Sequence, residues 1–199
     1  MVPMRNEHSQ EIFSYWDSLR LGEAVPTRTQ INPAAMRHRL PDLFILDHEG
    51  GDLTFLLAGT HICDLFDMEL RGNPFEVLWD SHFRAVANRA ATMALKTERP
   101  VVVDLSVEGA SAYPGFEALL LPMRSPQGRA TRLLGSLLPL GPIPALRPLT
   151  LGAFALDNWQ MIDKATSTDG EEEIVSPVRD EAKMFDRLWL GHAVPPLHL

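Results

Sequence analysis

The chain has 199 residues, 45% of them hydrophobic, and a formal net charge of −8 at pH 7. This length predicts one domain with extensions, and the acidic balance argues against a nucleic-acid surface, which needs clustered Lys and Arg. Cys63 is the single cysteine, so an internal disulfide is excluded and we expect a reducing, cytoplasmic location. Prolines interrupt the most apolar stretch, residues 133–156, so we expect no membrane span.

The N-terminal part, residues 1–38, predicts an amphipathic helix followed by a segment that enters the core. Apolar residues recur at helical spacing between residues 11 and 21: Ile12, Phe13, Trp16 and Leu19. Such a helix needs an apolar surface to cover. A second, short helix over 33–40 is stopped by Pro41.

Two strands joined by a tight turn follow, at about 43–48 and 53–59. The turn residues 49–52 include two glycines, which tolerate positive φ and favour a hairpin. Thr60 is a good helix cap, and the apolar residues after it keep helical spacing as far as Leu70. We therefore expect strand, turn, strand and short helix.

A longer helix over 81–96 precedes three strands, at about 101–108, 116–123 and 133–140. The first strand alternates between apolar and polar residues, so one of its faces is buried. The other two are apolar on both faces, which predicts cover on both sides of the sheet. The side chains on their second face are Leu119, Leu121, Leu134 and Leu138.

Four ordered motifs, LPDLFILD, LAGTHICDLF, MELRG and NPFEVLW, carry a resemblance to a known family. Over about residues 15–140 the chain resembles the short alphaproteobacterial family of PAS domains. The resemblance implies an α+β fold with a five-stranded antiparallel sheet in the order 2-1-5-4-3, helices on one face, and a core at residues 39–141. It also implies a sensory or regulatory role without a shared, established ligand.

Residues 142–199 have a different composition and are expected to lie outside the core. A proline-broken connector leads through an apolar segment, 151–162, to an acidic, Ser/Thr-rich linker at 163–173. An amphipathic tail helix over 178–190 is predicted to follow, with Phe185 and Trp189 on its apolar side.

The candidate ligand site is an apolar lining contributed by strands and helices that converge on one sheet face. Each of these residues can equally fill a core, and a gap among them is what would make a pocket. The lining candidates are Phe55, Phe66, Phe75, Trp79, Phe83, Val103 and Leu105.

Other chemistry has weaker support. His61 and Cys63 point about 200° apart on a helix, so they do not suit one metal ion. His82 is the histidine that a haem-binding PAS domain would use from a helix facing the sheet. The segment around Cys63 lacks the motif of light-sensing flavin relatives, and the chain has no G-x-S-x-G or G-x-G-x-x-G loop. We therefore expect no metal, no haem, no other cofactor and no catalytic activity.

These patterns favour a cytoplasmic regulatory domain that acts by contact with a separate signalling protein, with or without a small apolar ligand. An alternative is a constitutive dimeric interaction protein whose core is filled. Both predict a homodimer, because so many apolar side chains on the second sheet face need cover. The interface candidates are Trp16, Leu119, Leu121, Leu134, Leu138, Phe185 and Trp189.

Overall fold

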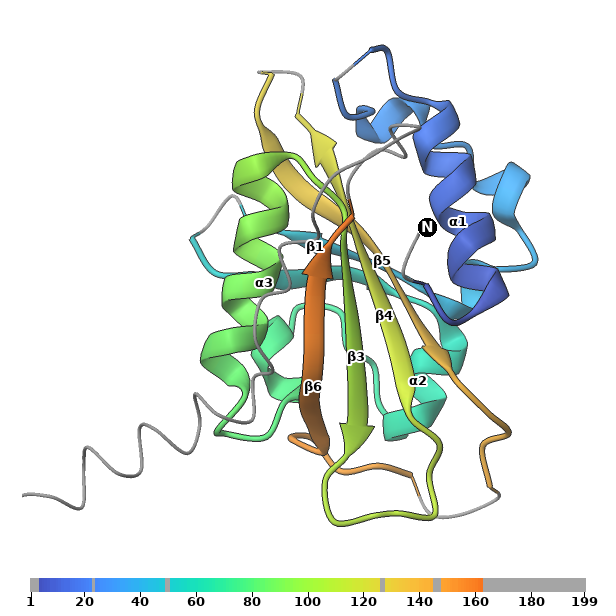
Figure 1. The fold of residues 1–199 in the computed structure, drawn as a ribbon, viewed down its shortest axis with the longest axis vertical. Coiled ribbons are helices and arrows are strands. Elements are labelled where there is room, and N and C mark those ends of the chain that lie inside the picture. The colour runs from blue at the N-terminus through green and yellow to red at the C-terminus, as the bar shows by residue number, and fades with distance from the viewer. Residues whose placement is uncertain (1–3, 23, 49–50, 126–127, 145–147, 163–199) are drawn as a thin grey trace, which may run out of the picture.

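The computed structural model describes residues 4–22, 24–48, 51–125, 128–144 and 148–162. These residues form one antiparallel sheet with helices on both of its faces (Figure 1). The strand order is β2-β1-β5-β4-β3-β6. The predicted order of the first five strands is confirmed, and a sixth strand that the sequence did not predict pairs with β3.

The elements follow the predicted chain order. The strands are β1 (Leu43–Asp47), β2 (Thr54–Ala58), β3 (Val101–Val107), β4 (Phe116–Arg124), β5 (Ala130–Pro139) and β6 (Phe154–Met161). The α-helices are α1 (Glu7–Ser18), α2 (Thr60–Phe66) and α3 (Arg84–Thr97). Four short 3-10 helices join them: η1 (Arg28–Gln30), η2 (Pro33–Met36), η3 (Leu40–Asp42) and η4 (Phe75–Leu78).

Three helix boundaries differ from the prediction for local reasons. The first helix begins at Glu7 because the side chain of Asn6 accepts the backbone N–H of His8 at 2.9 Å and caps it. The second ends at Phe66 because Asp67 adopts a left-handed φ of 50°. The third begins at Arg84, with Phe83 as its N-cap residue.

Strands β4 and β5 are buried on both faces, as predicted, and therefore separate two apolar clusters. The first cluster lies between the sheet and α2, η4 and α3, where alanines of α3 allow close packing on the sheet. The second lies on the other face, under α1 and the segment that follows it. Both layers belong to the chain itself.

The sixth strand was missed because a β-bulge breaks its period. Phe154 and Leu156 pack into the first cluster, and after the bulge Trp159 and Met161 pack against it. The apolar positions therefore shift from even to odd numbers, which removes the alternation that marks a strand in the sequence. The sheet extends past residue 141, the predicted end of the core.

Several predictions fall on residues that the structure does not describe. The acidic linker at 163–173 and the tail helix at 178–190, with Phe185 and Trp189, lie outside the described residues. Parts of two predicted turns, residues 49–50 and 126–127, lie outside them as well.

Candidate functional site

Aromatic rings form a continuous cluster on the face of the sheet that carries α2 and α3. Phe55 and Phe75 have ring centroids 6.0 Å apart, and Phe75 lies 5.5 Å from Trp79. Phe154, from the unpredicted strand, links the two ends of the cluster: its centroid is 6.3 Å from Trp79 and 5.6 Å from Phe66. Such edge-to-face and tilted contacts are favourable, so these rings stabilise one another as a core.

The structure brings the predicted lining residues together, with one partial exception. Six of them are buried in this cluster: Phe55, Phe66, Phe75, Trp79, Val103 and Leu105. Phe83 is half-buried and packs against the cluster from the start of α3. The rings therefore fill the space that the sequence offered as a pocket.

One polar atom in this cluster has no partner. The indole Nε1 of Trp79 is buried, and no acceptor for its N–H lies within hydrogen-bond distance among the described residues. A buried donor without a partner costs about 1–3 kcal/mol, so native cores normally pair it with protein, water or ligand. The Trp79 N–H is therefore the clearest sign of ligand chemistry in the core.

A strap, which we define as residues 148–153, crosses the helical layer before β6 begins. The backbone N–H of Leu149 donates to the carbonyl of Leu65 in α2 at 2.8 Å, and that of Gly152 donates to the carbonyl of Val77 in η4 at 2.7 Å. The side chain of Leu149 is only 7% exposed and belongs to the aromatic cluster. The strap is thus fixed to two helices and inserted into the core.

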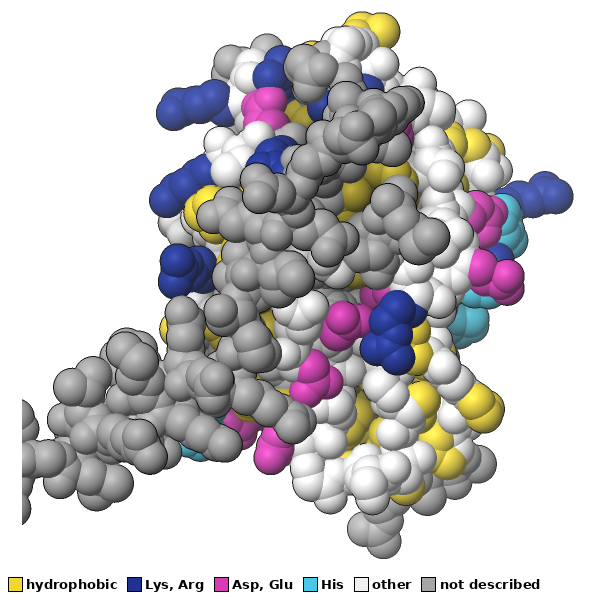
Figure 2. Space-filling model, viewed as in Figure 1, with side chains coloured by type: hydrophobic (Ala, Val, Ile, Leu, Met, Phe, Trp, Pro, Cys, Tyr) yellow, Lys and Arg dark blue, Asp and Glu magenta, His cyan; other side chains and the backbone are white. Residues whose placement is uncertain are grey.

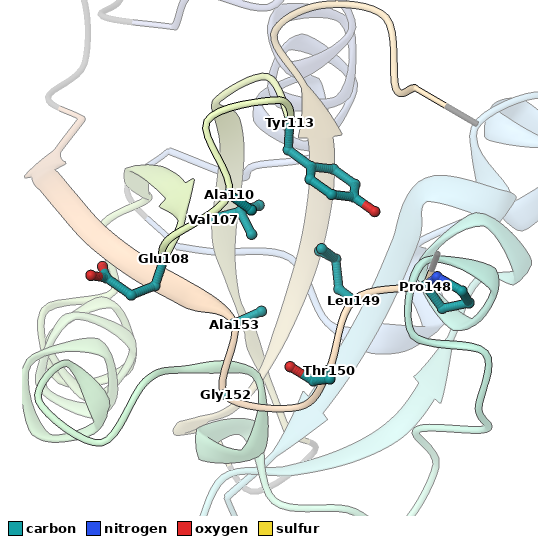
Figure 3. Close-up of a pocket in the computed structure, with 9 residues that line it drawn as sticks. All are labelled: Val107, Glu108, Ala110, Tyr113, Pro148, Leu149, Thr150, Gly152 and Ala153. Carbon is teal, nitrogen blue, oxygen red and sulfur yellow. The ribbon is translucent and has the colours of Figure 1, made fainter. Parts of the chain in front are cut away.

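A surface pocket of about 520 Å³ opens between the strap and the loop after β3 (Figure 3). Figure 3 shows the ring of Tyr113 and the side chain of Leu149 facing each other across it. The lining residues are Val107, Glu108, Ala110, Tyr113, Pro148, Leu149, Thr150, Gly152 and Ala153. The lining is mainly apolar; Tyr113 and Thr150 contribute hydroxyls, and the Glu108 carboxylate points away from Tyr113 and Leu149 in Figure 3.

None of the pocket residues was a sequence candidate. The predicted lining lies behind the pocket: a Cβ placed on Gly152 would lie 3.6 Å from the Trp79 carbonyl oxygen, and the N–H of Asp80 donates to the carbonyl of Phe154 at 2.8 Å. The strap and the start of β6 therefore lie against the backbone of Trp79 and Asp80. No signal in the sequence marks this arrangement, because it depends on where the proline-broken connector crosses the helices.

The histidines considered as metal or haem ligands lie at the surface. His82 is 74% exposed and its Nδ1 lies 2.7 Å from Asp80, so it does not face the sheet as a haem ligand would. Hydrogen bonds from the backbone N–H and ring of His82 lower the pKa of the Asp80 carboxyl. His61 pairs with Asp42 at 2.8 Å. Among the described residues, no three His, Cys, Asp or Glu side chains are grouped to hold a metal ion.

The thiol of Cys63 does not reach the aromatic cluster. It is half-buried, with Sγ 3.8 Å from the Ala58 carbonyl and 3.9 Å from a carboxylate oxygen of Glu69. These neighbours place it on the side of α2 near the end of β2. Its surroundings therefore do not fit a flavin held against the sheet for thiol chemistry.

The leucines predicted to form a dimer surface are instead buried within one chain. The four leucines of the second sheet face, Leu119, Leu121, Leu134 and Leu138, are at most 3% exposed and pack with Trp16 in the second cluster. The indole N–H of Trp16 donates to the Pro122 carbonyl at 3.1 Å. The N-terminal helix therefore covers this face within one chain, and these residues offer no surface to a second copy.

Two carboxylates anchor α1 over this face. The buried Glu117 accepts the backbone N–H groups of Arg5 at 2.6 Å and Asn6 at 3.2 Å. Glu11 accepts the Nε–H of Arg39 at 2.9 Å and lies 2.6 Å from His38 Nε2, and these hydrogen bonds, His38 first, lower the pKa of its carboxyl. The cover is thus held by polar contacts just before α1 and at Glu11 within it, as well as by apolar burial.

An antiparallel sheet with α2, η4 and α3 packed over an aromatic core on one face, and α1 covering the other, has the architecture of a PAS-type domain. The PAS domain family matches residues 4–138, and the chain belongs to it. This confirms the family and the α+β fold predicted from the sequence.

Two solved structures are similar in fold. One is an RNA-binding light-oxygen-voltage receptor, at 18% identity and a TM-score of 0.41, covering 58% of this chain and 35% of that one. The other is a light-oxygen-voltage domain studied with a flavin analogue, at 12% identity and a TM-score of 0.42, covering 79% of this chain and 92% of that one. The match thus spans about a third of the RNA-binding receptor.

A comparison with curated proteins finds no significant match. None of the helices in the described part of the chain is long and apolar enough to cross a membrane.

Proposed function

We propose that this sensory domain binds a small, mainly apolar ligand at the strap and passes the signal to a separate protein by contact, in the cytoplasm and without catalytic output of its own. The observation that carries the proposal is a mainly apolar surface pocket whose wall, the strap, inserts Leu149 into the core that also holds the unpartnered Trp79 N–H. An aromatic ligand with one hydroxyl or carbonyl group suits this chemistry, because the pocket supplies apolar walls and few polar atoms.

The strap supplies a physical route from ligand to output. A ligand in the pocket touches Leu149, whose side chain is part of the core, and Gly152, whose N–H is bonded to η4. Displacing Leu149 moves the strap, and the strap leads directly into β6 and the C-terminal residues. A local contact is thereby coupled to the sheet edge, where a partner can read it.

The test uses 2-naphthol and indole as probes and isothermal titration calorimetry as the measurement. Ala110→Phe places a ring in the pocket, and Ala112→Phe places the same ring at an exposed position of the same loop. We expect a probe to bind the parent chain, Ala112→Phe to keep its affinity, and Ala110→Phe to raise Kd at least about tenfold, which is 1.4 kcal/mol. Equal Kd values for the two variants, or no heat with either probe, contradict the proposal.

A second candidate function is a constitutive interaction protein with a filled core. The close ring contacts around Phe75 and Phe154 favour it, since they leave the predicted pocket occupied by protein. Native mass spectrometry of freshly purified protein separates the two functions. A bound small molecule supports the sensor. The mass of the bare chain, unchanged when 2-naphthol or indole is added, supports the alternative.

A further inference from the structure

The solvent face of α3 is basic and carries no acidic residue. Arg84, Arg89 and Lys96 are exposed, and the helix contains no Asp or Glu between its ends. Figure 2 shows Lys and Arg side chains along the edge of the molecule where α3 lies in Figure 1. Ala85, Arg89, Thr92 and Lys96 follow one helical stripe, so small side chains separate the cations.

This face stands out in a chain whose net charge is −8. Helices that carry surface cations usually place Glu or Asp three or four residues away, which pairs the charges within the helix. Here the exposed cations of α3 have no such acid on their own helix, and Glu98, just after it, is bonded to Arg124. The face is therefore suited to an acidic segment from elsewhere.

The described chain ends beside this helix. The hydroxyl of Thr97, at the end of α3, lies 3.8 Å from the sulfur of Met161, and the N–H of Ile162 donates to the Pro100 carbonyl at 2.8 Å. The residues that follow Ile162 thus begin at the C-terminal end of α3. Their first strongly acidic run is Asp169, Glu171, Glu172 and Glu173.

The reach of the chain matches the length of the helix. Asp169 lies seven positions after Ile162, and the chain between them spans at most about 23–25 Å. A helix of 14 residues, as α3 is, measures about 21 Å. The acidic run can therefore reach the N-terminal half of α3, where Arg84 and Arg89 lie and where the helix dipole favours negative charge.

We propose that the basic face of α3 is a docking site for residues 169–173 of the same chain. The docked run pairs its carboxylates with Arg89, with Arg84 further along at the flank of the face, and the preceding residues pass Lys96. Because the linker is short, the effective concentration of the acidic run at this face is high, which compensates for the weakness of single exposed ion pairs. An acidic partner protein would compete for the same face.

The experiment is carbodiimide cross-linking of the full chain, which joins a carboxylate to an amine in direct contact. Arg89→Lys keeps the charge and places an amine on the face, and Lys96, Lys164 and Lys183 are the lysines the chain already has. The matched control is Arg37→Lys, at an exposed position just after η2 on the α1 side of the sheet. Peptide mass spectrometry of the monomer band identifies which carboxylates are joined.

We expect position 89 to be joined to Glu171, Glu172 or Glu173 in the monomer band, and position 37 not to be. Adding Arg84→Glu is expected to lower the yield about two- to fivefold, the range set by exposed ion pairs, and 0.5 M NaCl to lower it further. Equal yields from positions 89 and 37, or a yield insensitive to salt, overturn the proposal. Cross-links confined to the dimer band also overturn it, because the acidic run would then come from a second copy.

Discussion

Gly135 in β5 should not tolerate even a methyl group, because the ring of Phe44 packs directly on its backbone. A Cβ built on Gly135 would lie 2.1 Å from two ring carbons of Phe44, against 3.4 Å or more in ordinary contacts. The Phe44 ring cannot simply move aside, since Phe55 and Phe75 lie 5.6 and 6.3 Å from it, centroid to centroid. Relief therefore requires a shift of more than 1 Å in a packed core.

We expect Gly135→Ala to lower the free energy of unfolding by about 1–3 kcal/mol, the usual cost of overpacking. The control is Gly115→Ala, where the nearest atom to a new Cβ is 3.5 Å away, and where loss of chain entropy in the unfolded state makes the change neutral or stabilising by up to about 1 kcal/mol. Urea unfolding followed by tryptophan fluorescence measures both. Equal midpoints for the two variants would refute the packing of Phe44 on β5.

Three further predictions concern the strap, the α1 anchor and Asp104 in β3. Leu149→Ala should cost about 2–4 kcal/mol in urea unfolding, and Leu151→Ala, which truncates a leucine 44% exposed, under about 1 kcal/mol; similar costs would mean that the strap is not packed. Glu117→Gln should cost about 1–3 kcal/mol, since it replaces one of the two accepting oxygens with an NH2 donor that faces a backbone N–H; no loss would place α1 elsewhere. Burial is the largest cause that raises the pKa of the Asp104 carboxyl. This carboxyl therefore stays protonated to higher pH in the folded state than in the unfolded chain. Stability relative to Asp104→Asn should therefore fall as pH rises from the ordinary Asp value through the raised one, and a flat difference would contradict this.

Trp79→Phe tests the unpartnered indole N–H. Because Phe is smaller than Trp, the change leaves a cavity in a packed cluster, so a loss of stability does not report on the N–H. Binding of 2-naphthol is the readout: we expect its Kd to rise, and an unchanged Kd would mean that the N–H does not serve the ligand.

The sequence was sufficient for the first five strands because their apolar patterns and turns are local. The N-terminal helix was also predicted, and its apolar side does cover the sheet. The sequence did not show whether α1 or a second subunit covers the second face of the sheet. That choice depends on polar anchors such as Glu117, which a single sequence presents only as an isolated acid in an apolar strand.

The strap and β6 could not be predicted for a different reason. Leu149 lies in a proline-rich stretch without helical or strand period, and its burial depends on hydrogen bonds to α2 and η4 that are far away in sequence. The bulge opposite Asp104 and Leu105 then changes the phase of β6. The predicted lining, including Trp79, was correctly placed in one cluster, but the pocket lies one layer further out.

Hydrogen–deuterium exchange of the full chain with and without 2-naphthol is the most direct test of a ligand site at the strap, because it reports on the pocket and the strap at once. We expect slower exchange confined to residues 107–113 and 148–156, with the amides of α1 unchanged. Slower exchange only outside these two segments, or no change at saturating 2-naphthol, would contradict a ligand site between the strap and the loop after β3.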